Sequence, residues 1–252
     1  MTVLAVFADP PRPGLALPEL PESSPVSERE AADLYAAALK DTLAAVERSG
    51  GELLINYRPD DLIAPEHEGD RSAEAEVRAL AADALDDPDD ARFEVQVGST
   101  FSARAGNTVT HLLEREGVRS AAVVPGTAPT LTRKEVDSAA MKLRRNEVVV
   151  GPSERGGAYF AGFTTAELDF EDAYAAPAVE TLTTRAVDAG HEVEFLPSMA
   201  EVRTGADLLS LVPVLNARAR AGRIVPEHTA SLLREWGLRV VEGEDGPELV
   251  RE

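Results

Sequence analysis

Short strand-like runs alternate with helical patterns through the first 150 residues, beginning with a continuous apolar run at 3–8. A run this uniformly apolar is typical of a parallel strand that is buried on both faces. Because strand–helix alternation is typical of βαβ units, the sequence predicts an α/β fold with three α/β/α layers and a mostly parallel sheet. We expect strands at 3–8, 53–57, 93–97, 120–124, 147–150, 158–163 and 192–196, and helices between Ser27 and Gly50 and at 72–85, 101–117, 132–143, 177–190 and 206–215.

Local signals mark the first long helix and the end of the chain. Ser27 with Glu30 three residues later is a capping box, which starts a helix, and Gly50 ends it. Residues 226–236 form a further helical pattern, and two short apolar runs around a Gly/Asp turn predict a small hairpin at 238–250. We expect one main α/β domain at 1–212 with a helical and hairpin extension at 213–252, and we expect Phe195 and Trp236 in the core.

Acidic residues exceed basic ones throughout the chain. Asp and Glu number 45 against 25 Lys and Arg, which gives a formal net charge of −20. This charge disfavours binding to nucleic acid and to anionic membranes. Either one acidic face holds a basic partner, or the whole surface is acidic because the protein works in concentrated salt. The even spread of acids and the scarcity of Lys favour a halophilic protein with an acidic surface.

Cysteine is absent, which excludes disulfides, thiolate nucleophiles and Cys-ligated metals. The first residues carry no basic segment of the kind that begins a signal peptide, and no apolar run approaches the ~20 residues of a membrane span. We expect a cytoplasmic protein that binds no membrane.

Most motifs of catalysis and metal binding are also absent. The four histidines are far apart, and no G-x-S-x-G, Walker A or G-x-G-x-x-G pattern occurs. The acidic run at 86–90 lacks the glycine turn and the terminal glutamate of a calcium loop, so we interpret it as a solvated turn. No residue is predicted to hold a metal ion.

Three Gly- or Pro-rich loops follow the expected parallel strands, at 9–25, 125–131 and 151–157. Ligands of such sheets bind beyond the carboxyl ends of the strands, so these loops are the expected functional loops. Within the third loop, Gly156 and Gly157 either let the backbone approach a ligand closely or serve a tight turn between strands.

The order of several segments resembles a known family. The chain is similar, over about residues 3–212, to glycosyltransferase-A-like proteins of the arsenosugar-biosynthesis type, which are relatives of the molybdenum-cofactor and phospholactate guanylyltransferases. The similar stretches are 31–43, which looks like the first helix of that family, Gln96 with 101–104, the Gly-Pro-x-x-x-Gly-Gly segment at 151–159, and the helix start at 176–181.

The resemblance implies that residues 1–212 form a nucleotide-diphospho-sugar transferase-like domain. It also implies a nucleoside diphosphate sugar or a nucleoside triphosphate bound over the first strand, with a divalent cation bridging its phosphates to Asp residues. Transferred onto this chain, it gives a set of candidate ligand-binding residues and no catalytic residue. The candidates are Ala8, Arg12, Gly14, Arg104, Thr127, Glu154, Arg155, Gly156, Gly157 and Arg203.

The chain departs from the family pattern in the first loop. Three cationic positions of the family are occupied here by Asp9, Leu17 and Glu19, and Arg12 is the one nearby replacement. A pyrophosphate would therefore meet carboxylates where the family supplies cations.

At the family's metal-facing positions, by contrast, expected carboxylates are replaced by neutral or basic residues. Thr127 or Ala128, Arg155 and Arg203 stand where carboxylates are expected, so no divalent cofactor is evident. The sequence favours a divergent glycosyl- or nucleotidyltransferase-like protein that binds a nucleotide or nucleotide-sugar without a metal, with Arg155 and Arg203 supplying positive charge. The alternatives are a catalytically inactive paralogue that acts as a partner or regulatory subunit, in a homo-oligomer or with an intact family member, and an ordinary metal-dependent transferase.

Overall fold

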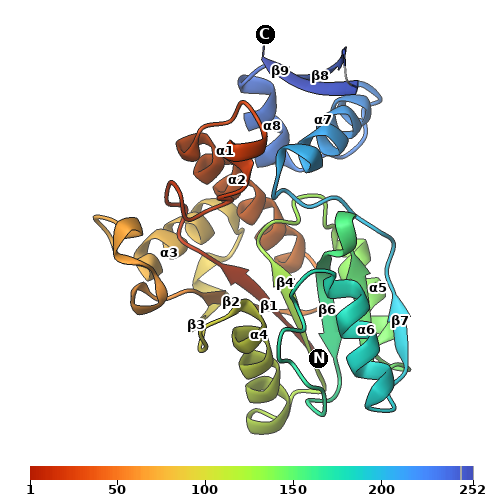
Figure 1. Cartoon of the computed structure of the whole chain (residues 1–252). Helices are drawn as coiled ribbons and strands as arrows, with labels where there is room; N and C mark the ends of the chain where they lie inside the picture. The colour runs from red at the N-terminus through yellow and green to blue at the C-terminus, as the bar shows by residue number, and fades with distance from the viewer. Residues whose placement is uncertain (245, 252) are drawn as a thin grey trace.

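The computed structural model describes residues 1–244 and 246–251 and contains a central seven-stranded sheet (Figure 1). Its strand order is β3-β2-β1-β4-β6-β5-β7, and every pairing is parallel except those of β6 with β4 and β5. The predicted mostly parallel α/β sheet is therefore confirmed. The strands are β1 (Thr2–Ala8), β2 (Glu52–Tyr57), β3 (Arg92–Val95), β4 (Ser120–Pro125), β5 (Val148–Pro152), β6 (Ala158–Phe163) and β7 (Val193–Phe195).

Helices cover both faces of this sheet, as the three-layer prediction requires. On β1, Leu4 and Val6 belong to the hydrophobic core that α2, α3 and α5 complete, whereas Val3, Ala5 and Phe7 belong to the opposite core with α4 and α6. The central strand is thus buried on both faces, which explains its continuous apolar run. The helices are α1 (Leu20–Ser23), α2 (Glu28–Glu47), α3 (Ala73–Ala84), α4 (Phe101–Thr110), α5 (Arg133–Lys142), α6 (Ala178–Asp188), α7 (Gly205–Arg220) and α8 (Glu227–Glu235).

The capping box of α2 is present as predicted. The Ser27 hydroxyl accepts from the Glu30 backbone N–H, and the Glu30 carboxylate accepts in return from the Ser27 backbone N–H at 2.8 Å. Such a cap contributes about 1 kcal/mol to helix stability. It fixes the start of the helix whose side chains, among them Leu34, Leu39 and Leu43, fill the core behind β1.

The C-terminal segment consists of α8 and a two-stranded hairpin of β8 (Leu238–Gly243) and β9 (Gly246–Arg251), beside α7 and α2 (Figure 1). The buried Asp41 carboxylate on α2 accepts from the backbone N–H groups of His228 and Thr229, at 3.1 and 2.8 Å. It therefore caps the first turn of α8 from another helix. The expected boundary after residue 212 lies inside the continuous α7, so the division into two domains stays a prediction.

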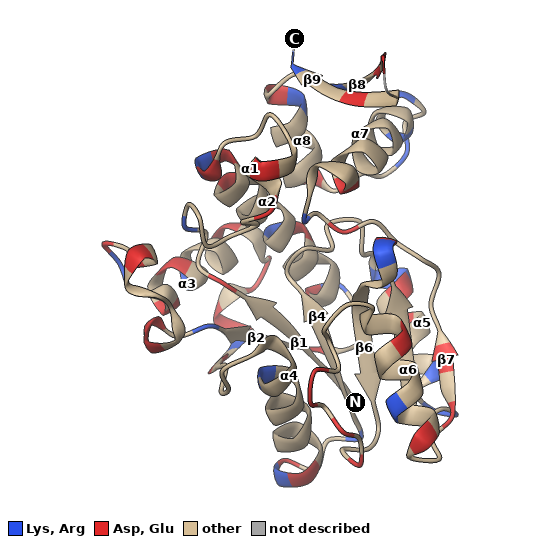
Figure 2. Cartoon of the chain, viewed as in Figure 1, with Lys and Arg blue, Asp and Glu red and all other residues tan. Residues whose placement is uncertain are grey.

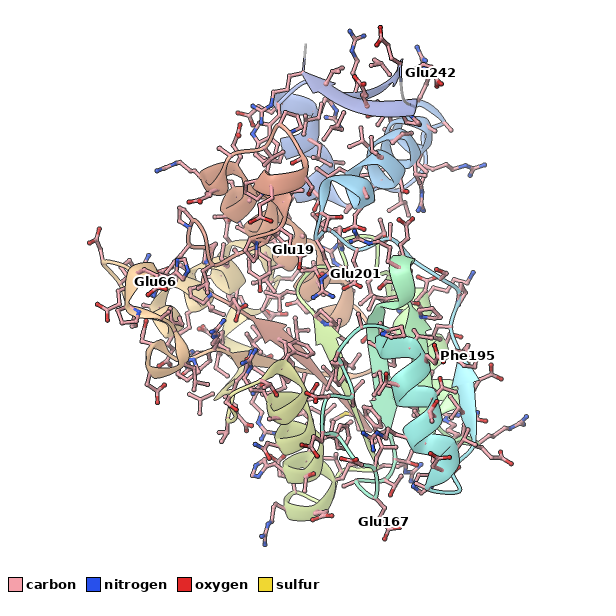
Figure 3. All side chains as sticks on the ribbon, in the orientation of Figure 1. Glu19, Glu66, Glu167, Phe195, Glu201 and Glu242 are labelled. Atoms are coloured by element: carbon pink, nitrogen blue, oxygen red, sulfur yellow. The ribbon has the colours of Figure 1, made fainter. Side chains whose placement is uncertain are left out.

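The predicted core position of Phe195 differs from the structure. Phe195 is 42% exposed because β7 is an edge strand, and Figure 3 shows its side chain at the outer edge of the sheet; its predicted core position is wrong. Trp236 is partly buried and packs against the core. The loop at 9–25 also contains one short helix, α1.

Charged side chains lie mainly on the outer segments. Figure 2 shows Asp and Glu on helices around the whole fold, whereas the central strands are largely free of charge. The salt adaptation inferred from the net charge of −20 stays a prediction. None of the helices described has both the length and the apolar character needed to span a membrane.

Candidate functional site

A cavity of about 260 Å³ lies at the carboxyl ends of β1 and β4. Its walls come from two of the three expected loops, 9–25 and 125–131, and from helices α2, α4 and α6, while the loop at 151–157 contributes no residue to it. This is the edge at which ligands of open α/β sheets bind. The lining residues are Phe7, Asp9, Leu15, Ala16, Leu17, Pro18, Glu19, Tyr35, Gln96, Phe101, Arg104, Pro125, Gly126, Thr127, Ala158, Tyr174, Ala178 and Arg203.

Three aromatic rings form one wall of the cavity. The ring centroids of Phe7 and Phe101 are 5.2 Å apart, and those of Phe101 and Tyr174 are 5.0 Å apart with an interplanar angle of 70°. The Arg104 guanidinium carbon lies 5.9 Å from the Phe101 centroid. This wall offers a planar ligand an apolar surface next to a cation.

Three residues that line the cavity also have a polar atom with no partner. Gln96 Oε1, Arg104 Nε and the Tyr174 hydroxyl are buried and make no hydrogen bond, although Gln96 Nε2 donates to the Asn56 carbonyl at 2.7 Å. A buried polar atom without a partner costs about 1–3 kcal/mol, and native proteins contain few of them. Three of the residues that line the cavity therefore each have a buried polar atom whose hydrogen bonding the described residues leave unsatisfied.

Asp9 and Arg104 face the same space with opposite charges. Burial raises the pKa of the Asp9 carboxyl, and the positive charges of Arg58 and Arg104 partly offset this effect. Burial also lowers the pKa of the Arg104 guanidinium, with Asp9 opposing the change. The two groups attract one another without a direct ion pair between them. The backbone N–H of Asp9 donates to the Tyr35 hydroxyl at 2.8 Å, which fixes the chain where it leaves β1.

Of the ten candidate ligand-binding residues, Arg104, Thr127 and Arg203 line the cavity. Among the residues described, the Arg203 guanidinium makes no hydrogen bond or ion pair, and Arg203 is exposed immediately before α7. Ala8 is fully buried in β1, and Gly14 lies in a turn against His67 with a φ of 75°. Neither residue lines the cavity.

Arg12 does not line the cavity. Its guanidinium is buried and donates to the carboxylates of Glu76 and Asp60, at 3.1 and 3.0 Å, and to the carbonyls of His67 and Arg71, at 3.1 and 2.9 Å. The side chain therefore holds the first loop to the segment before α3. Its expected contact with a ligand stays a prediction.

Arg155 is also engaged inside the fold. Its terminal nitrogen Nη2 donates to both carboxylate oxygens of Asp207, each at 3.1 Å. The Asp207 carboxylate is buried and also accepts from the backbone N–H groups of Arg203 and Thr204. Arg155 neutralises this carboxylate, and Glu154 accepts from the Ser210 hydroxyl nearby.

Gly157 serves close packing and a tight turn. The Ser153 backbone N–H donates to the Gly157 carbonyl at 2.8 Å, and a Cβ at Gly157 would lie 2.2 Å from Ser153 Oγ and 3.1 Å from Glu201 Oε2. Gly156 has a φ of 76°, which glycine adopts readily. Of the two functions considered for this pair, the geometry matches the tight turn.

The residues at the family's metal positions do not suit a divalent ion. Thr127 Oγ1 donates to the buried Glu201 Oε1 at 2.8 Å, and the other expected acidic positions hold Arg155 and Arg203. A single carboxylate at these positions supplies fewer oxygen ligands than Mg²⁺ or Mn²⁺ requires. We therefore derive no step through a metal ion, and metal independence stays a prediction.

Elsewhere in the part of the chain that the structure describes, only Glu94, His111 and Glu116 bring three metal-binding side chains together. His111 Nε2 lies 3.1 Å from Glu116 Oε1, and Arg92 contacts both carboxylates. The guanidinium already occupies the position between the two acids.

Comparison with known proteins gives a family and a fold. Residues 42–174, just over half of the chain, match the family model described as "Uncharacterized protein conserved in bacteria (DUF2064)". No protein with curated annotation matches the chain.

Solved structures give the same fold at low sequence identity. A candidate nucleotide-diphospho-sugar transferase from Desulfovibrio desulfuricans G20 is similar with 22% identity and a TM-score of 0.74, covering 93% of this chain and 94% of that one. The 4-diphosphocytidyl-2C-methyl-D-erythritol synthase of Anaerococcus prevotii has 12% identity and a TM-score of 0.52, with 86% and 98% covered. A cytidylyltransferase of Leptospira borgpetersenii has 10% identity and a TM-score of 0.51, with 93% of each chain covered. These matches confirm the nucleotide-diphospho-sugar transferase-like fold.

Proposed function

The chain belongs to the DUF2064 family, and on that premise we propose that it is a transferase-like protein whose cavity binds a nucleotide or nucleotide-sugar without a divalent metal ion. One observation carries the proposal: Gln96, Arg104 and Tyr174 line the cavity, and each has a buried polar atom without a partner. A heterocyclic base has a planar face and an edge of donors and acceptors, which is the combination this wall requires.

Different side chains of the cavity would contact different parts of a base. The Phe101 ring would contact the face of the base, Gln96 Oε1 would accept from an exocyclic amine or ring N–H, and Arg104 would donate to a carbonyl oxygen. Hydrogen bonds from a buried guanidinium are stronger than neutral ones because the donor is charged.

Arg203 is the group best placed to bind a phosphate. It lines the cavity, it is exposed, and its guanidinium has no partner among the residues described. Arginine binds phosphate with two parallel N–H···O bonds, so it supplies positive charge where the family's second acidic position would have held a metal ion.

The reaction class rests on the fold and is the finer part of the proposal. Proteins of the same fold carry the names transferase and cytidylyltransferase, which favours glycosyl or nucleotidyl transfer over other nucleotide chemistry. Membership of the arsenosugar-biosynthesis type is the narrower prediction, and no side chain of the cavity identifies an acceptor.

Isothermal titration calorimetry in molar KCl with EDTA tests the proposal. We expect at least one of a panel of UDP- and GDP-sugars, GTP, CTP and nucleoside monophosphates to bind more tightly than millimolar. Arg203→Ala and Phe101→Ala should each weaken that binding about tenfold or more. Arg220→Ala, which removes the same charge from the exposed far end of α7, and Phe195→Ala at the distant sheet edge are the matched controls. If no nucleotide binds in the panel, the proposal is wrong.

A second function is favoured by the positions of Arg12 and Arg155. Two of the three expected replacement cations, Arg12 and Arg155, bind carboxylates within the fold, as they would in a catalytically inactive paralogue that acts as a partner or regulatory subunit. Purification from native lysate tests this function. A stable complex with an intact family member would favour it, whereas a monomer recovered alone that binds nucleotide would count against it.

A further inference from the structure

Thr127 joins the cavity wall to the segment that precedes α7. The residue lines the cavity and is half-buried. Its hydroxyl donates to Glu201 Oε1 at 2.8 Å, and its backbone carbonyl accepts from the Val202 backbone N–H, also at 2.8 Å. Glu201 is only 3% exposed, and Figure 3 labels it close to the start of α7. Two hydrogen bonds to this segment therefore hold Thr127 in place at the cavity.

These two bonds determine what Thr127 can offer to a ligand. A threonine hydroxyl has one proton to donate and two lone pairs with which to accept, whereas an ionised carboxylate only accepts. Because the Thr127 proton is donated to Glu201, the hydroxyl oxygen retains only lone pairs. A ligand group that bonds to this side chain must therefore be a donor. Phosphate oxygens, which accept, are unsuited to the contact, whereas hydroxyl and amine groups are suited to it.

The strand order indicates which part of a nucleotide reaches Thr127. Gln96 follows β3 and Thr127 follows β4, and β2 and β1 lie between these two strands. At about 4.8 Å between neighbouring strands, β3 and β4 are about 14 Å apart. The glycosidic bond leaves a base on the side away from its hydrogen-bonding edge, so a base whose edge meets Gln96 directs its ribose away from β3, across the cavity. The donors in that part of the ligand are hydroxyl groups.

From this geometry we infer that Thr127 accepts a hydrogen bond from a sugar hydroxyl of the bound nucleotide and makes the site selective for ligands that carry that hydroxyl. The inference rests on the proposed nucleotide binding and names a group that the site recognises. Two sources share this chemistry: the ribose and, in a nucleotide-sugar, the attached sugar. A site that bonds a hydroxyl discriminates against the analogue that lacks it, because the analogue leaves a polar group of the protein without its partner.

Calorimetry with EDTA present tests the inference on the tightest-binding nucleotide or nucleotide-sugar of the panel above. The parent is compared with its 2′-deoxy and 3′-deoxy analogues and, for a nucleotide-sugar, with analogues that lack one hydroxyl of the attached sugar, which separates the two sources. We expect one analogue to bind about five- to tenfold more weakly than its parent, as the loss of one hydrogen bond requires. An amino group at that position also donates and should restore most of the affinity, whereas a fluoro group should not. Equal binding of every deoxy analogue would overturn the inference but leave nucleotide binding intact, whereas binding of no nucleotide would overturn both.

Variants of Thr127 test whether this side chain is the acceptor. Thr127→Val removes the hydroxyl at nearly constant shape, so parent and deoxy analogue should bind to it equally, whereas Thr127→Ser should keep the wild-type preference. Thr127→Ala makes the same comparison if Thr127→Val does not fold. Thr130→Val is the matched control, because Thr130 lies in the same loop and donates to the Ala200 carbonyl but does not line the cavity. A purely structural Thr127 would leave the ratio of parent to deoxy affinity unchanged in the variants, and that result would overturn the inference.

Discussion

Substitution of Arg12 tests most directly whether an expected ligand-binding residue instead stabilises the fold. Arg12→Met retains much of the apolar stem and removes the guanidinium. The change deletes the bonds to the Glu76 and Asp60 carboxylates and leaves the carbonyls of His67 and Arg71 without their donor.

The magnitude follows from the exposure of the partners. Breaking a fully buried ion pair costs about 3–5 kcal/mol. Here the Arg12 side chain is only 6% exposed, but those of Asp60 and Glu76 are 48% and 17% exposed, so water can partly replace the lost guanidinium. We therefore expect Arg12→Met to lower the free energy of unfolding by about 2–4 kcal/mol.

Urea unfolding, followed by circular dichroism at fixed KCl, measures this change, because urea leaves the ionic strength constant. The midpoint should fall while the slope m is unchanged. Arg133→Met is the control: Arg133 is 69% exposed in an i,i+4 pair with Asp137, so its loss should cost no more than about 0.5 kcal/mol. An Arg12→Met variant with the wild-type midpoint and no nucleotide binding would refute the structural assignment.

Three other predictions concern stability. The Arg251 guanidinium lowers the pKa of Glu30 from 4.5 to about 2. The stability that this partly exposed pair contributes is therefore fully present above pH 4.5 and is lost as pH falls towards 2. Arg251→Met should reduce the free energy of unfolding by about 1 kcal/mol at pH 6 and by almost nothing at pH 2, as measured by urea titration at each pH. Gly205→Ala would place a Cβ 2.0 Å from the Ser23 carbonyl oxygen and should lower the unfolding free energy by more than about 2 kcal/mol, measured in urea; a neutral result would contradict the close approach of α1 and α7. Asp41→Ala removes the cap of α8 and should cost about 1–2 kcal/mol, with faster amide exchange confined to α8; unchanged exchange there would contradict the capping role.

The fold was predictable because its signals are local. The apolar run at 3–8, the Ser27–Glu30 capping box and the glycines at 50–51 each act within a few residues of chain, and each has the predicted consequence in β1 and α2. Phe195 was not predictable in this way, since only the strand order places β7 at an edge. Helix α7 also runs on to Arg220, beyond the expected end at 215.

The site was predictable only in part, because its chemistry depends on distant partners. Arg104 and Arg203 line the cavity as expected. Arg12 and Arg155 do not, since the carboxylates that bind them lie 48–64 and 52 residues away in sequence. Tyr174 has no local signal at all, and it reaches the cavity because its backbone N–H donates to a serine side chain on α4.

The most direct test of the central claim is a crystal structure of the protein soaked in EDTA with a nucleoside monophosphate that binds in calorimetry. Nucleotide binding without a metal ion predicts the base against the Phe101 ring, within hydrogen-bonding distance of Gln96 and Arg104, and the phosphate at Arg203. A nucleotide outside the cavity, or one that appears only when a divalent ion is added and held by Glu201, would contradict the account.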